Sequence, residues 1–177
     1  MRASDPVWSV KVLVGEVPPT GRHFKLVADA ATRAALEKEI GLRALPRLEA
    51  VFDVERHGRD GLHVIGSVSA TVGQNCVVTL DPLESEITEK IDLVFAPQEG
   101  DADDAIHLGL ESRDPPEPLI DGRVDLGAIA VEFLTLGIDF YPRKPDAALE
   151  PPPAEDTARH PFAALAALKK GKSEENR

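Results

Sequence analysis

The chain has 177 residues and a formal net charge of −11, and this length suits one compact domain with a tail. The charge is uneven, with 10 basic and 9 acidic residues in 1–60 (+1), 2 and 12 in 61–120 (−10), and 8 and 10 in 121–177 (−2). Because nucleic acid is densely negative, this composition excludes the broad basic face of proteins that grip RNA or DNA directly.

The chain has a single cysteine, Cys76, which excludes an internal disulfide and an all-cysteine zinc site within one chain. The start of the chain contains no apolar run of signal-peptide length. No stretch approaches the roughly 20 apolar residues of a membrane-spanning helix. We therefore expect a cytoplasmic protein that does not cross a membrane.

The first part of the chain predicts two strands and a helix. Alternating valines in residues 8–14 indicate one strand, and residues 24–28 indicate a second. Asp29 is the predicted N-cap of a helix over residues 31–40, because its carboxylate can accept hydrogen bonds from the first-turn amides. Gly41 is the predicted C-cap of that helix.

The middle of the chain predicts an antiparallel meander. Apolar residues alternate with polar ones over residues 48–54 and, most regularly, over residues 62–72. A period of two places all these apolar side chains on one face of a strand. We expect a turn over residues 58–61 to connect these two strands.

Beyond these strands, the chain is expected to turn over residues 73–75. Residues 76–80 are apolar and indicate a short strand, which Asp81 and Pro82 are expected to break. The last strand of the meander is predicted to contain residues 87–95.

The remaining sequence predicts one further strand and one further helix. An acidic loop over residues 99–104 precedes a short predicted strand over residues 106–110. A second helix is predicted with Asp125 as its N-cap, because apolar residues within 126–137 fall on one stripe at helical spacing. Residues 141–142 are expected to close this helix.

The order of the elements predicts an α+β fold, with an antiparallel or barrel-like sheet, two flanking helices and a short C-terminal helix. Residues 1–142 form one predicted domain. Residues 143–160 contain four prolines and no apolar periodicity, so they form a predicted linker. Residues 161–177 are expected to form a short helix and a frayed tail.

The C-terminal helix has the features of a docking segment on a tether. Phe162, Leu165 and Leu168 share one face, from which they would place apolar anchors in a groove on a partner. The alternatives are that the helix folds back on its own domain or does not form, since a helix of about ten residues is marginal alone in water.

Four arginines in the near-neutral first third of the chain form a candidate patch for direct contact with RNA. They are Arg43, Arg47, Arg56 and Arg59. The alternative is that these side chains lie solvated on a face of the sheet.

A metal-dependent enzyme is an alternative function, because Asp101, Asp103 and Asp104 supply carboxylate oxygens of the kind that hard cations bind. A calcium-binding loop that began at Asp101 would also need a glycine at its sixth position and an acid at its twelfth. The chain has Ile106 and Ser112 there. This mismatch favours a solvated acidic loop.

Nucleophilic catalysis has little support in the sequence. Ser67 and Ser69 lie on a predicted strand and not in a glycine-flanked elbow. Cys76 has His57 and His63 as candidate partners, but no motif places either beside it, so a partly buried structural cysteine is favoured. The chain contains no phosphate-binding glycine motif. We therefore predict no catalytic residue, no metal and no cofactor.

Several segments, in order, resemble the YceD family. They are the turn Gln74-Asn75-Cys76-Val77-Val78-Thr79-Leu80-Asp81-Pro82-Leu83, the strand over residues 87–97, the helix segment 120–142 with Val124-Asp125-Leu126-Gly127, and the ending Pro161-Phe162-Ala163-Ala164-Leu165-Ala166-Ala167-Leu168-Lys169. Many members carry a second cysteine three positions after the first, where this chain has Thr79. Cys76 therefore has no local partner for binding a metal.

The resemblance implies a role in the synthesis, processing or stability of large-subunit ribosomal RNA, without known catalytic activity. With the charge pattern, it predicts a non-catalytic accessory that acts mainly through ribosomal or assembly proteins, or through a limited basic patch. Whether the chain contacts RNA directly is left open. The acidic middle would mimic RNA toward a basic ribosomal protein. The alternatives are a divalent-metal hydrolase or nuclease that uses residues 101–104, and a small-ligand binding module. The partner and the oligomeric state are left open.

Overall fold

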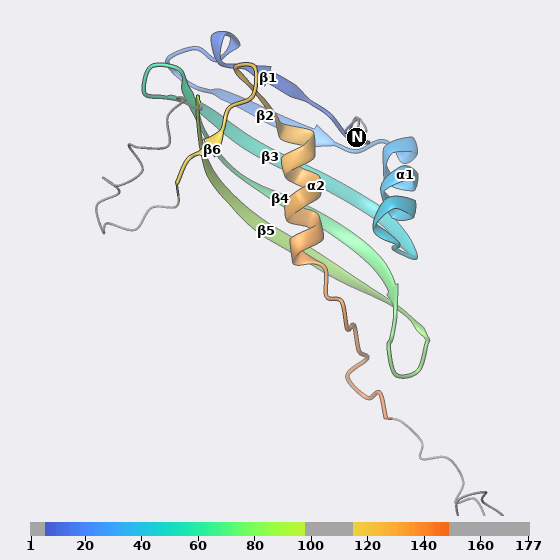
Figure 1. Ribbon diagram of the computed structural model, residues 1–177. Coiled ribbons are helices and arrows are strands. Elements are labelled where there is room, and N and C mark those ends of the chain that lie inside the picture. Colours follow the sequence, from blue (N-terminus) through green and yellow to red (C-terminus); the bar gives the residue numbers. More distant parts are fainter. Residues whose placement is uncertain (1–5, 98–114, 149–177) are drawn as a thin grey trace, which may run out of the picture. The chain divides into compact units, whose positions relative to one another are not determined.

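The computed structural model describes residues 6–97 and 115–148, and the chain divides into the compact units Met1–Lys144 and Pro145–Arg177. Every described helix and strand lies in the first unit (Figure 1). In chain order they are β1 (Lys11–Leu13), the 3-10 helix η1 (Val14–Glu16), β2 (Arg22–Val27), α1 (Ala30–Ile40), β3 (Ala44–His57), β4 (Gly61–Asn75), β5 (Pro82–Ala96), β6 (Glu117–Pro118), β7 (Arg123–Asp125) and α2 (Leu126–Gly137).

The main sheet has the strand order β2-β3-β4-β5-β6, and β1 pairs with β7 in a separate two-stranded sheet. Strands β2 to β5 are antiparallel neighbours, whereas the two-residue β6 runs parallel to β5. The predicted α+β class and antiparallel meander are confirmed. Among the described strands the sheet runs from one edge to another without closing, so a barrel-like sheet is not confirmed.

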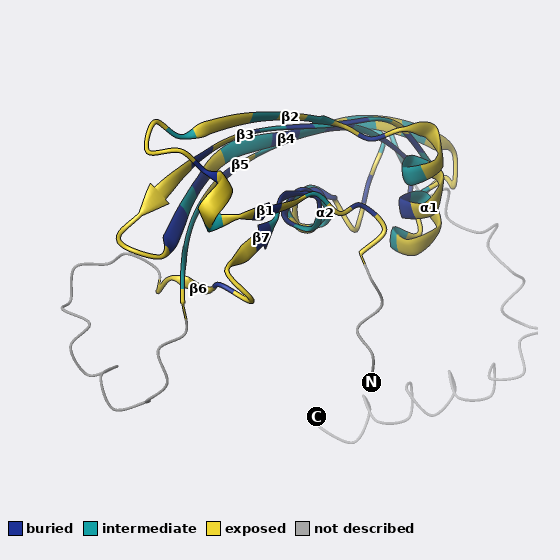
Figure 2. Ribbon diagram, turned by 90° about the horizontal axis from the view of Figure 1, so that it is seen from above, coloured by how far each residue is buried: buried dark blue, intermediate teal, exposed yellow. Residues whose placement is uncertain are grey.

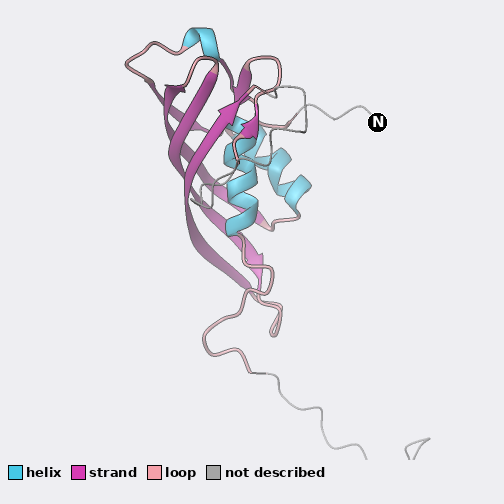
Figure 3. Ribbon diagram, turned by 60° about the vertical axis from the view of Figure 1, so that its left-hand side comes forward, coloured by secondary structure: helices cyan, strands magenta, loops and turns pink. Residues whose placement is uncertain are grey.

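Both helices and the β1–β7 pair lie on one side of the main sheet, which curves around α2 (Figure 2 and Figure 3). The alternation predicted for β4 is present, because Leu62, Val64, Val68, Ala70 and Val72 are all buried. They join one core with residues of α1, α2 and β1. The opposite face of the sheet carries the polar residues of the alternation and has no described element over it.

The helix caps are as predicted. The Asp29 carboxylate accepts a hydrogen bond from the Thr32 amide at 2.7 Å, and Gly41 ends α1 in the left-handed conformation, with a φ of 80°. The Asp125 carboxylate accepts from the amides of Gly127 and Ala128 at the start of α2. In the part of the chain that is described, no helix is long and apolar enough to cross a membrane.

Two predictions about the strands were wrong. β4 continues through Gly73 to Asn75, and the apolar segment 76–80 is a turn and not a strand. The turn is closed by hydrogen bonds from the Cys76 amide to the Asp81 carbonyl and from the Leu80 amide to the Cys76 carbonyl. Pro82 begins β5 because an edge position does not need its missing N–H.

The ends of three other elements also differ from the prediction. The first strand covers only β1, because the chain enters the 3-10 helix at Val14. The second strand begins at Arg22 and ends at Val27, and α2 ends at Gly137, four residues before Tyr141. The predicted strand over 106–110, the acidic loop over 99–104 and the C-terminal helix over 161–170 lie outside the described residues.

Gly66 provides a test of the core. It lies at the centre of β4, where an added Cβ would come 2.8 Å from Cδ1 of Phe52 and would also meet the Val51 carbonyl oxygen. We expect Gly66→Ala to lower the free energy of unfolding by about 2 kcal/mol through overpacking, as measured by urea denaturation. Gly15→Ala is the control, because nothing lies within 4 Å of its Cβ position. Equal stability of the two variants would contradict this packing.

Candidate partner-binding surface

The side of the main sheet that no described element covers is a broad surface with many polar side chains, and we call it the open face. It carries the side chains that alternate with the core along β2 to β5. One row across it, set by the strand register, joins His23, Asp53, Ile65 and Asp92. Because every described helix lies on the other side, this face is open to a partner.

Charge changes sign across the sheet. β2 contains Arg22 and Lys25 and no acidic residue, and β4 contains no Asp, Glu, Lys or Arg. β5 contains one lysine and four acids, which are Glu84, Glu86, Glu89 and Asp92. Since β2 and β5 lie on opposite sides of the meander, the sheet has one basic and one acidic margin. The negative charge that the sequence places in its middle third is therefore in part a feature of β5.

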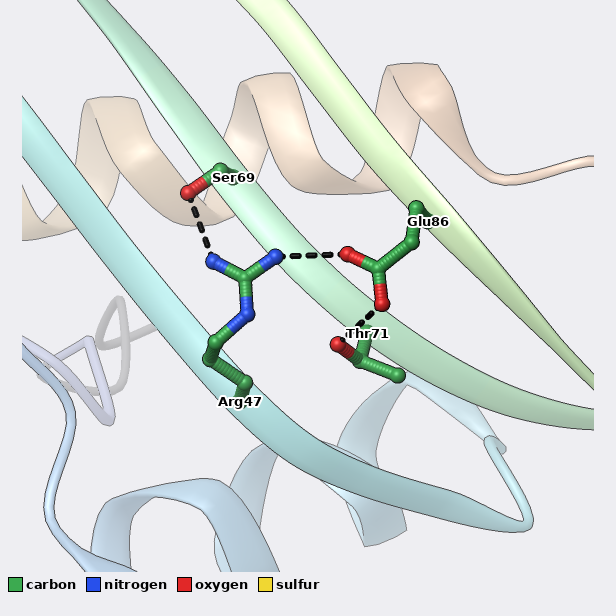
Figure 4. Close-up of polar contacts among 4 residues, drawn as sticks. All are labelled: Arg47, Ser69, Thr71 and Glu86. Atoms are coloured by element: carbon green, nitrogen blue, oxygen red, sulfur yellow. Dashed lines mark hydrogen bonds and ion pairs between the residues drawn. The ribbon is translucent and has the colours of Figure 1, made fainter.

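A polar network joins three strands on the open face (Figure 4). The Arg47 guanidinium donates to the Ser69 hydroxyl at 2.9 Å and to the Glu86 carboxylate at 2.6 Å. The Thr71 hydroxyl donates to the other oxygen of Glu86 at 2.6 Å. The Thr71 hydroxyl and then the Arg47 guanidinium lower the pKa of Glu86. Arg47 is thus committed to a carboxylate of the protein itself.

Two histidine–aspartate pairs lie on the same face. His63 Nε2 lies 2.7 Å from Asp92 on β5, and His23 Nδ1 lies 2.8 Å from Asp53 on β3. Both Asp side chains are more than half exposed, at 75% and 63%. Exposed pairs of this kind contribute little to stability, so they remain available to exchange partners.

The structure does not gather the four predicted arginines into one patch. Arg43 and Arg59 are exposed and flank the 14-residue strand β3 at opposite ends. Arg56 lies about 40 Å along the strand from Arg43 at a rise of about 3.3 Å per residue. Its Nε donates to the Val17 carbonyl at 2.6 Å, which ties it to the segment after η1. A single basic surface made of these four residues is therefore not formed.

The C-terminal candidates, Phe162, Leu165 and Leu168, lie outside the described residues, so their docking role stays a prediction. The same holds for the carboxylates Asp101, Asp103 and Asp104. Within the described ranges, no group of three or more His, Cys, Asp or Glu side chains is arranged to hold a metal ion.

Cys76 is fully buried in the β4–β5 turn, whereas a partly buried cysteine was expected. Its sulfur accepts from the Thr79 amide at 3.5 Å. Hydrogen bonds from the Thr79 hydroxyl, then from the Lys144 and Thr79 amides, lower its pKa to about 6. His57 and His63 lie at the other end of β4, so the structure separates Cys76 from both candidate bases.

Sequence reasoning missed several exposed apolar side chains in the β4–β5 turn and around the end of α2. They are Leu80 at 75%, Tyr141 at 73%, Phe140 at 72% and Leu136 at 70% exposed. The Val77 amide donates to the Pro142 carbonyl, which brings the segment after α2 against the turn. The only sequence signal for these exposed side chains was the pair Phe140-Tyr141, which we interpreted as part of the end of the second helix.

The Arg47–Glu86 network predicts a dependence of stability on pH. The folded-state pKa of Glu86 lies below its ordinary value of 4.5. Its interactions therefore stabilise the fold above that value and are lost as the pH falls through the folded-state pKa. We expect Glu86→Gln to reduce the loss of unfolding free energy between pH 5 and about pH 3, measured by urea denaturation.

The matched control is Glu84→Gln, because Glu84 lies on the same strand and face without a described side-chain partner. We expect its stability to follow the wild-type dependence on pH. An unchanged pH profile for Glu86→Gln would show that the network does not stabilise the fold.

The burial of Cys76 predicts how fast its thiol reacts with a reagent. Its lowered pKa favours the reactive thiolate, but the side chain has no exposed area. We expect a thiol reagent at pH 7.5 to modify the folded protein at least about a hundredfold more slowly than the urea-unfolded protein, since reaction requires local opening. Equal rates in the two states would contradict the closed turn.

Comparison with known proteins supplies one match. The family model described as "Large ribosomal RNA subunit accumulation protein YceD" matches residues 64–169, more than half of the chain. This range contains nearly all of β4 and the whole of β5, β6, β7 and α2. A comparison with curated proteins and with solved structures finds no match. The matched range holds both the acidic strand and the buried cysteine turn, and the chain belongs to the YceD family.

Proposed function

We propose that this chain is a non-catalytic accessory factor in the cytoplasm that promotes accumulation of large-subunit ribosomal RNA by binding a basic protein of the assembling subunit. The description of the family supports the role in ribosomal RNA accumulation. The sign change of charge across the sheet supports the mode of action. The acidic margin at β5 suits a protein partner and not RNA.

The argument for a protein partner rests on the balance of charges. An acidic strand repels the phosphates of RNA, and it attracts the lysine- and arginine-rich protein segments that themselves bind RNA. Glu84 and Glu89 have no ion-pair partner among the described residues, so their charges are not neutralised within the fold. β5 can thus bind the RNA-binding surface of a basic protein in place of RNA, until the RNA displaces it.

The rest of the proposed architecture follows the same logic. Residues 143–160 act as a linker, and Phe162, Leu165 and Leu168 on the C-terminal helix supply a second, apolar contact with the partner. Two weak contacts on one chain raise the effective concentration of each for the other. No described feature favours a metal-dependent hydrolase or a small-ligand module, so neither is proposed.

The proposal predicts how binding depends on charge. In a pull-down at low salt, we expect the chain to recover ribosomal or assembly proteins of the large subunit, and the yield to fall as salt increases. The double variant Glu84→Gln/Asp92→Asn should recover several-fold less. The variant Glu39→Gln/Glu132→Gln makes the same charge change on exposed helix positions and should bind like wild type.

The cellular test is depletion followed by profiling of precursor ribosomes. We expect loss of large-subunit particles without loss of small-subunit particles, with rescue by wild type and by the Glu39→Gln/Glu132→Gln control. Equal loss of both subunits would contradict the proposed role. Recovery of RNA without any protein partner in the pull-down would contradict the proposed mode of action.

A further inference from the structure

We infer that the edge of β5, which pairs with no described strand over most of its length, binds an extended, lysine- or arginine-rich segment of a protein by adding it to the main sheet as another strand. The basic character of this partner rests on the proposed function. The binding mode rests on the backbone geometry of β5, which can be tested separately.

The orientation of the β5 backbone follows from three hydrogen bonds. The Leu119 amide donates to the Ala96 carbonyl at 2.8 Å, so Ala96 faces β6 and points away from β4. The Cys76 amide donates to the Asp81 carbonyl, so odd-numbered positions face β4. The Arg43 amide donates to the Gly73 carbonyl, so the backbone groups of odd-numbered β4 residues point toward β3. Those of even-numbered β4 residues then point toward β5, in agreement with the two hydrogen bonds above.

This orientation holds along the whole strand. The β4–β5 register runs without a shift from Leu62–Phe95 to Asn75–Pro82, and backbone direction alternates with each residue. The N–H and C=O groups of five consecutive even-numbered residues therefore point away from the sheet. These residues are Glu84, Glu86, Thr88, Lys90 and Asp92, and we call them the β5 edge.

The β5 edge has no described pairing partner. β6 pairs with β5 only at Phe95 and Ala96. Among the described residues, no backbone or side-chain hydrogen bond reaches the N–H or C=O groups of the β5 edge from its outer side. Figure 1 shows β5 along the margin of the sheet, with α2 over its face and not over its edge. The edge is thus a ready template for strand addition.

The side chains of β5 specify what an added strand should contain. All five residues of the β5 edge are exposed on the open face, and three of them are acidic. The opposite face of the strand is mainly apolar, with Leu83 and Leu93 half-buried, and its one carboxylate is the half-buried Glu89. A cross-strand neighbour therefore meets mainly carboxylates on one face and mainly apolar groups on the other. An alternation of basic and apolar residues fits this pattern.

The same charges disfavour a second copy of the chain at this edge. Two β5 strands side by side would bring together two edges that each carry three carboxylates and one lysine, and this net like charge is unfavourable. Pro82 at the start of the edge and Lys90 within it are features that limit unselective pairing of edge strands. The basic strand β2 of a second copy is the competing occupant, and its pairing would depend on protein concentration.

The direct test is amide hydrogen exchange of the full chain by NMR, with and without a synthetic ten-residue peptide of alternating lysine and valine. We expect saturating peptide to slow the exchange of the Glu86, Thr88 and Lys90 amides by about tenfold or more, because these amides become hydrogen-bonded. The amides of His23 and Lys25 on the β2 edge should not change. A peptide of equal charge interrupted by prolines should give no protection.

A pair of proline variants tests the backbone contribution. Thr88→Pro removes one outward N–H without removing a β4–β5 hydrogen bond, and it should weaken peptide binding about tenfold. Val27→Pro does the same at the β2 edge and should bind as wild type does. Glu84→Gln/Asp92→Asn should weaken binding about fivefold. If Thr88→Pro does not fold, the exchange measurement on the wild-type chain still decides.

The outcomes separate this inference from the proposed function. Peptide binding that depends on the carboxylates but leaves the β5 amides unprotected would overturn strand addition and leave the proposed function intact. Protection that grows with protein concentration without peptide would assign the edge to a second copy and overturn the inference. In a third outcome, the peptide protects the β5 amides, but depletion of the chain from cells leaves large subunits unchanged. This outcome would support the inference and contradict the proposed function.

Discussion

The burial of one face of the main sheet, above all of its three long strands, is the constraint on which the rest of the structure depends. β3, β4 and β5 are each 14 or 15 residues long, and their alternating apolar side chains form one core with α1 and α2. A slip of one residue would turn that core to solvent, so the register is strongly specified. The same register places Arg47, Thr71 and Glu86 in contact on the other face.

The surface chemistry follows from that arrangement. Since both helices cover the same side of the sheet, the polar side chains that alternate with the core lie mostly on the open face. Because β5 is a long strand, its exposed carboxylates and its outward-pointing backbone groups lie along one line. The acidity of β5 and its edge without a described neighbour are separate properties, and together they support the proposal of a basic, extended protein partner.

Sequence reasoning was strongest where local chemistry decides. The caps at Asp29, Gly41 and Asp125 depend on residues within one turn, and the core of β4 depends on a period of two. It failed at residues 76–80, because an apolar segment was expected to form a strand. There the hydrogen bonds of Cys76 with Leu80 and Asp81 favour a turn that buries the cysteine.

By itself the sequence determined the α+β class, the helix caps, the acidic middle and the resemblance to the YceD family, because these depend on neighbours in the chain. Only the tertiary structure decided that Arg43 and Arg56 lie far apart, that Arg47 is paired with Glu86, and that most of β5 has no neighbour beyond it among the described strands. These facts depend on which strands are neighbours and on which way each backbone group points. Neither is encoded in local spacing, since both arise when distant segments pair.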